Sequence, residues 1–89
     1  MFARKVDRNQ GEIVKALEQA GCSVESLHRV GKGVPDLLVG RAGRNLLLEV
    51  KATQRAKPNE RQNEWHTAWR GYVHVVRTVE DALRAVGAI

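Results

Sequence analysis

Two short apolar segments separated by a turn constrain the fold of this chain more than any other feature. They cover residues 36–40 and 45–52, and the tetrapeptide 41–44 between them reads Arg-Ala-Gly-Arg. Apolar runs that flank a short, glycine-containing turn predict an antiparallel hairpin. Because both segments carry apolar residues on both faces of the strand, we expect the sheet to be covered on both sides.

Apolar residues at helical spacing predict a helix near the start of the chain. Ile13, Leu17 and Ala20 lie on one face of such a helix, and Gly21 follows as its stop. Either of two residues is expected to cap the N-terminus, with an acid or amide three positions later: Asp7 with Gln10, or Asn9 with Glu12.

The rest of the chain alternates between strand and helix patterns. The expected elements are a short strand within 22–30, a helix over 59–70, a strand over 72–77 and a last helix from Thr78 to Gly87. The order helix–strand–strand–strand–helix–strand–helix predicts an α/β fold, a mixed β-sheet flanked by helices. A chain of 89 residues is expected to form a single domain, residues 1–89.

Charge and cysteine content narrow the class of protein. Fifteen Lys and Arg against ten Asp and Glu give a net charge of +5, which favours a nucleic-acid partner. The single cysteine, Cys22, excludes an internal disulfide and a multi-cysteine zinc site. No apolar run exceeds three residues, which is too short for a membrane span or a signal peptide, so we expect a cytoplasmic protein.

The hairpin brings two carboxylates together. With a loop over 41–44, or a two-residue loop at Ala42-Gly43, paired positions sum to 85, and Asp36 then lies opposite Glu49. Side chains at opposite positions have Cβ atoms about 4.5–5.5 Å apart, and Lys51 points to the same face as Glu49. Facing like charges are destabilising, and a divalent cation is the natural compensation because it prefers oxygen ligands.

Such a cation suits hydrolysis of a phosphodiester bond. It polarises a phosphate oxygen and acidifies a water molecule, while Lys51 orients or deprotonates that water, or stabilises the developing negative charge. Taken alone, Glu-X-Lys on a strand is more often a simple ion pair, and Asp after Pro is more often a turn residue. The combination of both on one hairpin of a basic chain is what favours a catalytic site.

Three sets of residues together resemble the VRR-NUC family (virus-type replication-repair nucleases) of the PD-(D/E)XK nuclease superfamily, particularly its short stand-alone phage and bacterial members. They are the segment 33–37 (Gly-Val-Pro-Asp-Leu), the segment 48–51 (Leu-Glu-Val-Lys), and Gln62 with Trp65 and His66. The resemblance implies a restriction-endonuclease-like core and a Mg²⁺-dependent DNA endonuclease, with Mn²⁺ as a substitute. It also implies a homodimer similar to Holliday-junction resolvases.

The resemblance assigns roles to individual residues. It implies that Asp36, Glu49, Lys51 and Gln62 are catalytic. It places the metal on Asp36, Glu49, the backbone carbonyl of Val50, and Glu12. Glu12 is explained equally well as a first-turn acid that favours the helix dipole.

Several other side chains can be interpreted either as structural or as nucleic-acid-binding residues. Trp65 and Trp69, one helical turn apart, are expected in the core rather than stacked on an unpaired base. Basic side chains in loops around the site are expected to contact phosphate: Arg29, Lys32, Arg41, Arg44, Arg55, Lys57, Arg61 and His66. Since nothing resembles a base-reading helix, we expect recognition of DNA structure rather than sequence. The alternative is a non-catalytic nucleic-acid-binding module on the same fold.

Overall fold

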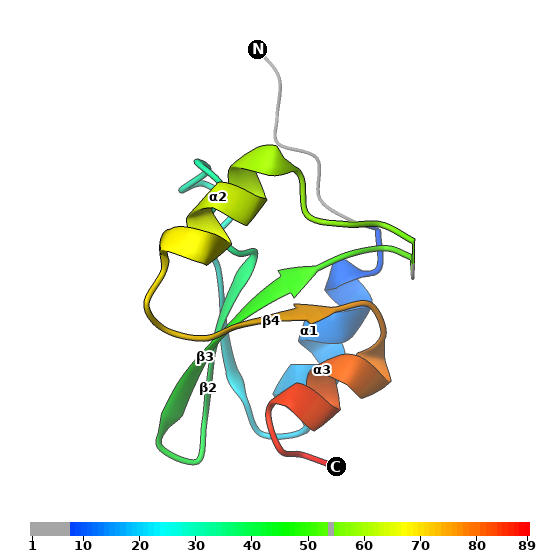
Figure 1. Cartoon of the computed structure of the whole chain (residues 1–89). Coiled ribbons are helices and arrows are strands. Elements are labelled where there is room, and N and C mark those ends of the chain that lie inside the picture. Colours follow the sequence, from blue (N-terminus) through cyan, green and yellow to red (C-terminus); the bar gives the residue numbers. More distant parts are fainter. Residues whose placement is uncertain (1–7, 54) are drawn as a thin grey trace.

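A computed structural model describes residues 8–53 and 55–89 of the chain. Its elements run in the order α1 (Gln10–Gln19), β1 (Ser23–Ser26), β2 (Leu37–Arg41), β3 (Arg44–Val50), α2 (Glu60–Ala68), β4 (Val73–Val76) and α3 (Val79–Ala85) (Figure 1). The predicted α/β fold with a mixed sheet flanked by helices is confirmed. Asp7, one of the two expected caps, and Gln54 lie outside the described residues.

The four strands form one sheet in the order β1-β2-β3-β4. β1, β2 and β3 pair antiparallel, and β4 joins β3 in parallel. The hairpin turn has two residues, Ala42 (φ 51°) and Gly43 (φ 79°), and two successive positive φ angles are typical of a type I′ turn. Leu37 pairs with Leu48 and Arg41 with Arg44, so the predicted register is confirmed.

One face of the sheet carries the hydrophobic core. Leu37, Val39, Leu48 and Val50 point to this face and are fully or almost fully buried. They pack against Ile13 and Leu17 of α1, against Ala82 of α3, and against Val86, the C-cap residue of α3, all of which are buried. Since alternate residues of a strand point to opposite faces, Leu38, Leu47 and Glu49 lie on the other face.

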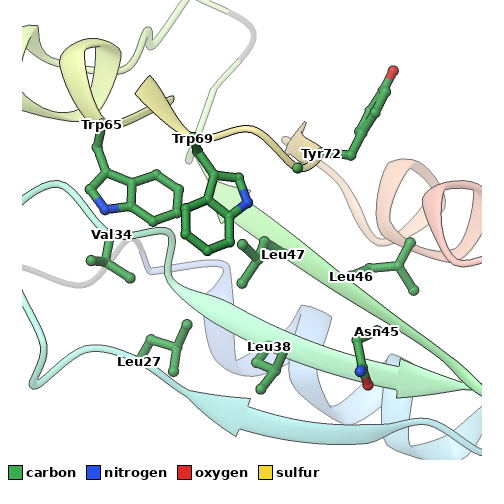
Figure 2. A pocket seen from close by; sticks show the side chains of 10 residues that line it. Leu27, Val34, Leu38, Asn45, Leu46, Leu47, Trp65, Trp69 and Tyr72 are labelled. Carbon is green, nitrogen blue, oxygen red and sulfur yellow. The ribbon is translucent and has the colours of Figure 1, made fainter. Parts of the chain in front are cut away.

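That other face is covered only in part, so the expected cover on both sides is half correct. Helix α2 and the segment that follows it lie over this face and leave an apolar hollow of about 440 Å³ (Figure 2). Leu38 on its floor remains 36% exposed. The nine residues of α2 are too few to cover the full length of both hairpin strands.

Among the described residues, of the caps predicted for α1 and α3 only the one at α3 forms its side-chain hydrogen bond. Thr78 accepts a hydrogen bond from the Asp81 backbone N–H (2.9 Å), which confirms the predicted start of α3. Asn9, one of the two predicted caps, does occupy the N-cap position of α1, but its side chain makes no capping hydrogen bond and donates instead to the carbonyls of Lys51 (3.2 Å) and Arg77 (2.9 Å). Long-range carbonyls that need a donor thus take precedence over the local cap.

The observed elements are shorter than the patterns predict. β1 uses four of the nine residues in 22–30, and α2 ends at Ala68 rather than at residue 70. Within the described parts of the chain, no helix has the length and apolarity needed to cross a membrane.

Candidate active site

The glycine-rich loop before β2 positions Asp36. Gly31, Lys32 and Gly33 have consecutive positive φ angles of 67°, 58° and 81°. The loop is closed by a hydrogen bond from the Leu27 N–H to the Asp36 carbonyl (2.8 Å). A Cβ on Gly33 would lie 2.5 Å from the carbonyl oxygen of Arg61, so only glycine allows this loop to approach α2 so closely. The loop therefore fixes Asp36 relative to the start of α2.

Asp36 and Glu49 meet at the end of the hairpin, as the predicted register requires. Both are buried, Asp36 at 8% and Glu49 at 1% exposure. Asp36 Oδ2 accepts a hydrogen bond from the Val50 backbone N–H (2.7 Å). Burial, followed by the charge of Asp36 and a hydrogen bond with it, raises the pKa of Glu49 to about 8. The site thus opposes simultaneous ionisation of the two acids.

Gln62, in the first turn of α2, connects this pair to Lys51. Its Nε2 donates to Glu49 Oε2 (2.9 Å), and its Oε1 accepts from Lys51 Nζ (2.9 Å). The same Oε1 accepts from the Asn59 backbone N–H (2.8 Å), while Asn59 Oδ1 accepts from the Gln62 N–H (2.9 Å). This reciprocal pair is a capping box, so the cap that starts α2 also aims Gln62 at the site.

Lys51 and His66 flank the two oxygens of Glu49. Lys51 Nζ lies 3.4 Å from Oε2, and His66 Nε2 lies 3.9 Å from Oε1. Within the described residues, Glu49 Oε1 and His66 Nε2 are both buried without a hydrogen-bond partner. Burial, followed by the positive charge of Lys51, lowers the pKa of His66. A neutral imidazole therefore faces an oxygen that has spare capacity to accept.

The donor set suits a divalent cation. Two carboxyl groups in contact, one with an unpartnered buried oxygen, offer the hard oxygen ligands that Mg²⁺ prefers. A cation can replace the proton that Asp36 and Glu49 need when they lie together. No third acid joins them: across residues 8–53 and 55–89, no group of three His, Cys, Asp or Glu side chains is placed to hold a metal.

Glu12 does not complete a three-acid cluster with Asp36 and Glu49 in the described part of the chain, and its role as a metal ligand stays a prediction. It is exposed in the first turn of α1, and α1 covers the face of the sheet opposite to Glu49. Its position also fits a first-turn acid that favours the helix dipole.

The basic residues divide into three groups. Lys32 and Arg61 line a hollow of about 280 Å³ that also includes Asn59 and Gln62, so two cations lie beside the site. Arg29, Arg55 and Lys57 are exposed in the loops that precede β2 and follow β3.

Arg41 and Arg44 belong to a different part of the molecule. They lie at the hairpin turn, about 17 Å along β3 from Glu49. Both donate to the Val86 carbonyl at the end of α3, at 3.4 and 3.2 Å. The expectation that they border the site is therefore not met, and they instead satisfy the last carbonyls of a helix.

Sequence reasoning missed two residues that support the site. The role of Asn59 could have been predicted, because Asn-X-X-Gln at the start of a helix is a capping-box pattern. The role of Asn9 could not, since nothing in the neighbouring sequence shows that its amide reaches the strand ends at Lys51 and Arg77.

Comparison with known proteins supports the resemblance to the VRR-NUC family. No protein-family model matches the chain, and no curated protein matches it significantly. A solved structure described as "VRR_NUC domain" superposes with a TM-score of 0.71 at 27% sequence identity, and the match covers 89% of this chain and 95% of that chain. The resemblance noted from the spaced motifs is thus confirmed by the fold.

Proposed function

From this likeness to a VRR_NUC domain, we propose that the chain is a metal-dependent DNA endonuclease. The observation that carries the proposal is the buried contact between Asp36 and Glu49, with Lys51 and Gln62 bonded to the same carboxylate. Two buried acids in contact are costly for stability, since burial and mutual repulsion oppose the ionisation of both. A catalytic role accounts for keeping them together.

Asp36, Glu49 and the backbone carbonyl of Val50 are the proposed ligands of Mg²⁺, with Mn²⁺ as a substitute. The bound ion supplies Lewis acidity at the scissile phosphate. Glu49 is held in place for this task by Gln62, which fixes Oε2 and leaves Oε1 without a hydrogen-bond partner among the described residues. Lys51, 13% exposed at the rim, places its ammonium where negative charge develops on the phosphate.

The proposed substrate is the DNA backbone. Lys32 and Arg61 border the hollow next to Gln62, the hydrogen-bond partner of Lys51, so two positive charges are available to a phosphate beside the site. Contacts of this kind position a strand without reading its sequence. The proposed contact with the backbone extends to Arg29, Arg55, Lys57 and His66. It does not include Arg41 and Arg44.

A homodimer would offer two such sites to two strands of a branched duplex. Branched or Holliday-junction-like DNA is therefore the proposed preferred substrate, in keeping with the resemblance to stand-alone VRR-NUC proteins.

The test is a cleavage assay on end-labelled single-stranded, duplex, flap and four-way-junction DNA, each with Mg²⁺, Mn²⁺ or EDTA. We expect cleavage with either metal and none in EDTA. Asp36→Asn and Lys51→Ala should each lower the rate at least about 100-fold, the scale on which single electrostatic groups act. The control is Lys15→Ala, an exposed lysine on α1. Full activity of Asp36→Asn, or cleavage in EDTA, would refute the mechanism.

The alternative, a non-catalytic nucleic-acid-binding module, makes a different prediction. It requires salt-dependent DNA binding with no cleavage in any divalent metal. The Asp36–Glu49 contact argues against it, because a binding surface for phosphate gains nothing from two buried acids.

A further inference from the structure

His66 and Glu49 present two buried polar atoms to each other across a short gap. His66 Nε2 lies 3.9 Å from Glu49 Oε1, and in the part of the chain that the structure describes neither atom has a hydrogen-bond partner. A hydrogen bond between nitrogen and oxygen is about 2.7–3.2 Å long, so the two atoms come close to one without forming it. Because buried polar atoms are rarely left unsatisfied, two that face each other require an explanation.

Helix α2 brings His66 to this position. His66 follows Gln62 by four residues, so the two side chains lie on the same face of the helix, one turn apart. Gln62 Nε2 donates to Glu49 Oε2 (2.9 Å), whereas His66 Nε2 faces Oε1. One face of α2 thus presents a nitrogen to each oxygen of the same carboxylate.

The other contacts of His66 do not explain this nitrogen. A positive charge in the last turn of α2 would favour the helix dipole, but burial, followed by the charge of Lys51, lowers the pKa of His66 and favours the neutral ring. The edge-to-face contact with Trp65, with ring centroids 6.1 Å apart, needs an aromatic ring but no nitrogen. Since Nε2 is buried, a phosphate contact falls to the exposed part of the ring, which is 16% of the side chain.

We propose that His66 is a positioning residue of the metal site, which donates from Nε2 to Glu49 Oε1 when that carboxylate holds the cation. This role rests on the metal site of the proposed function. Carboxylates that ligate a metal are in turn hydrogen-bonded by neighbouring groups, which orient them. A carboxylate oxygen has two lone pairs, so Oε1 can accept from His66 and still bind the ion.

The gap between the two atoms fits this role. A carboxylate that ligates a cation is ionised, and hydrogen bonds from nitrogen to an ionised oxygen are short, about 2.7–2.9 Å. Closure of the gap from 3.9 Å therefore needs a movement of about 1 Å. With Gln62 on Oε2 and His66 on Oε1, α2 would hold both oxygens of Glu49 and give the carboxylate one orientation towards the ion.

The first test is the Mn²⁺ affinity of the DNA-free protein, measured from the electron paramagnetic resonance signal of the unbound ion. His66→Phe retains a planar ring without an N–H and should raise the dissociation constant about 10–100-fold. His66→Gln retains a side-chain N–H donor and should recover most of that loss. Thr67→Ala, at the exposed neighbour of His66 on α2, should leave the constant within about twofold.

Thermal melts of the metal-free variants separate this role from a structural one. His66→Phe should melt no lower than the wild type, because it removes a buried nitrogen that has no hydrogen-bond partner among residues 8–53 and 55–89. A structural role predicts instead that the melting temperature without metal falls together with the Mn²⁺ affinity, and that result would count against the proposal.

Crystals of the wild type with Mn²⁺ bound give a readout that needs no variant. His66 Nε2 and Glu49 Oε1 should lie within about 3.2 Å of each other, and a separation that stays near 3.9 Å would overturn the proposal. Full Mn²⁺ affinity of His66→Phe, or equal losses in His66→Phe and His66→Gln, would overturn it as well. Those results leave the nuclease assignment intact if Asp36→Asn still abolishes Mn²⁺ binding, whereas a wild type that binds no Mn²⁺ would refute both.

Discussion

At the scale of single residues, the side chain of Gln62 makes several of the hydrogen bonds that organise the site. Its amide oxygen accepts from Lys51 and from the Asn59 backbone, and its amide nitrogen donates to Glu49. Since the oxygen faces two donors and the nitrogen faces a carboxylate, the orientation of the amide is fixed by chemistry. One side chain thereby joins the start of α2 to both functional ends of the Glu-X-Lys motif.

Removal of this amide should destabilise the protein. Gln62→Ala leaves Glu49 Oε2 without its amide donor, and an unsatisfied buried polar group costs about 1–3 kcal/mol. Urea unfolding followed by circular dichroism would measure the loss. Asn63→Ala is the matched control, because Asn63 is the exposed neighbour on the same helix and should change stability by less than about 0.5 kcal/mol. Equal effects of the two substitutions would contradict the role given to Gln62.

Glu49 predicts a pH dependence for the metal-free protein. Its pKa rises from 4.5 in the unfolded chain to about 8 in the folded one, so the folded state retains a proton that the unfolded state loses. The resulting stability is complete below pH 4.5 and is lost as the pH rises through 8. Thermal melts in EDTA should therefore show Glu49→Gln gaining on the wild type between pH 5 and about 9. A constant difference across that range would argue against the raised pKa.

At the scale of elements, the loop 31–35 decides where α2 sits relative to the hairpin. Gly33→Ala should lower the melting temperature, because φ of +81° is strained for alanine and its Cβ would lie 2.5 Å from the Arg61 carbonyl. Gly31→Ala is the control, with φ of +67° and nothing within 4 Å of a Cβ. It should show only the backbone strain of about 1–2 kcal/mol. If Gly33→Ala were no worse than Gly31→Ala, the close approach to α2 would not matter.

The sequence predicts some elements better than others for a physical reason. The hairpin register follows from the turn, because one pairing of Arg41 with Arg44 fixes every pair up to Leu37 with Leu48. The opposition of Asp36 and Glu49 could therefore be predicted. The lengths of β1 and α2 could not, because they depend on contacts with distant segments. The same holds for Asn9, whose partners lie 42 and 68 residues away.

At the scale of the whole molecule, the two faces of the sheet differ in how far they are covered and in which residues they carry. The face under α1 and α3 is a closed core, whereas the face under α2 carries the acids, the basic hollow and the apolar hollow. Strand patterns that are apolar on both faces cannot distinguish a covered face from one left open for a partner. The proposed catalytic residues could be predicted from the spaced motifs, but the division of the basic residues required the positions of Arg41 and Arg44 against α3.

The placement of positive charge predicts how DNA affinity depends on salt. Arg61→Ala should reduce the slope of log K against log salt concentration by about 0.9 on duplex DNA, the value of one phosphate contact. Fluorescence anisotropy with Asp36→Asn as the inactive background would measure the slope. Arg44→Ala, at the far end of the hairpin, should leave the slope unchanged. An equal decrease in both variants would contradict the proposed path of the DNA.

The position of the metal tests the central claim most directly. Crystals of the protein soaked in Mn²⁺ should give an anomalous difference peak that contacts carboxylate oxygens of both Asp36 and Glu49, and Glu49→Gln crystals should lose that peak. A peak elsewhere, or a peak that persists in Glu49→Gln, would contradict a metal-dependent nuclease built on this pair of acids.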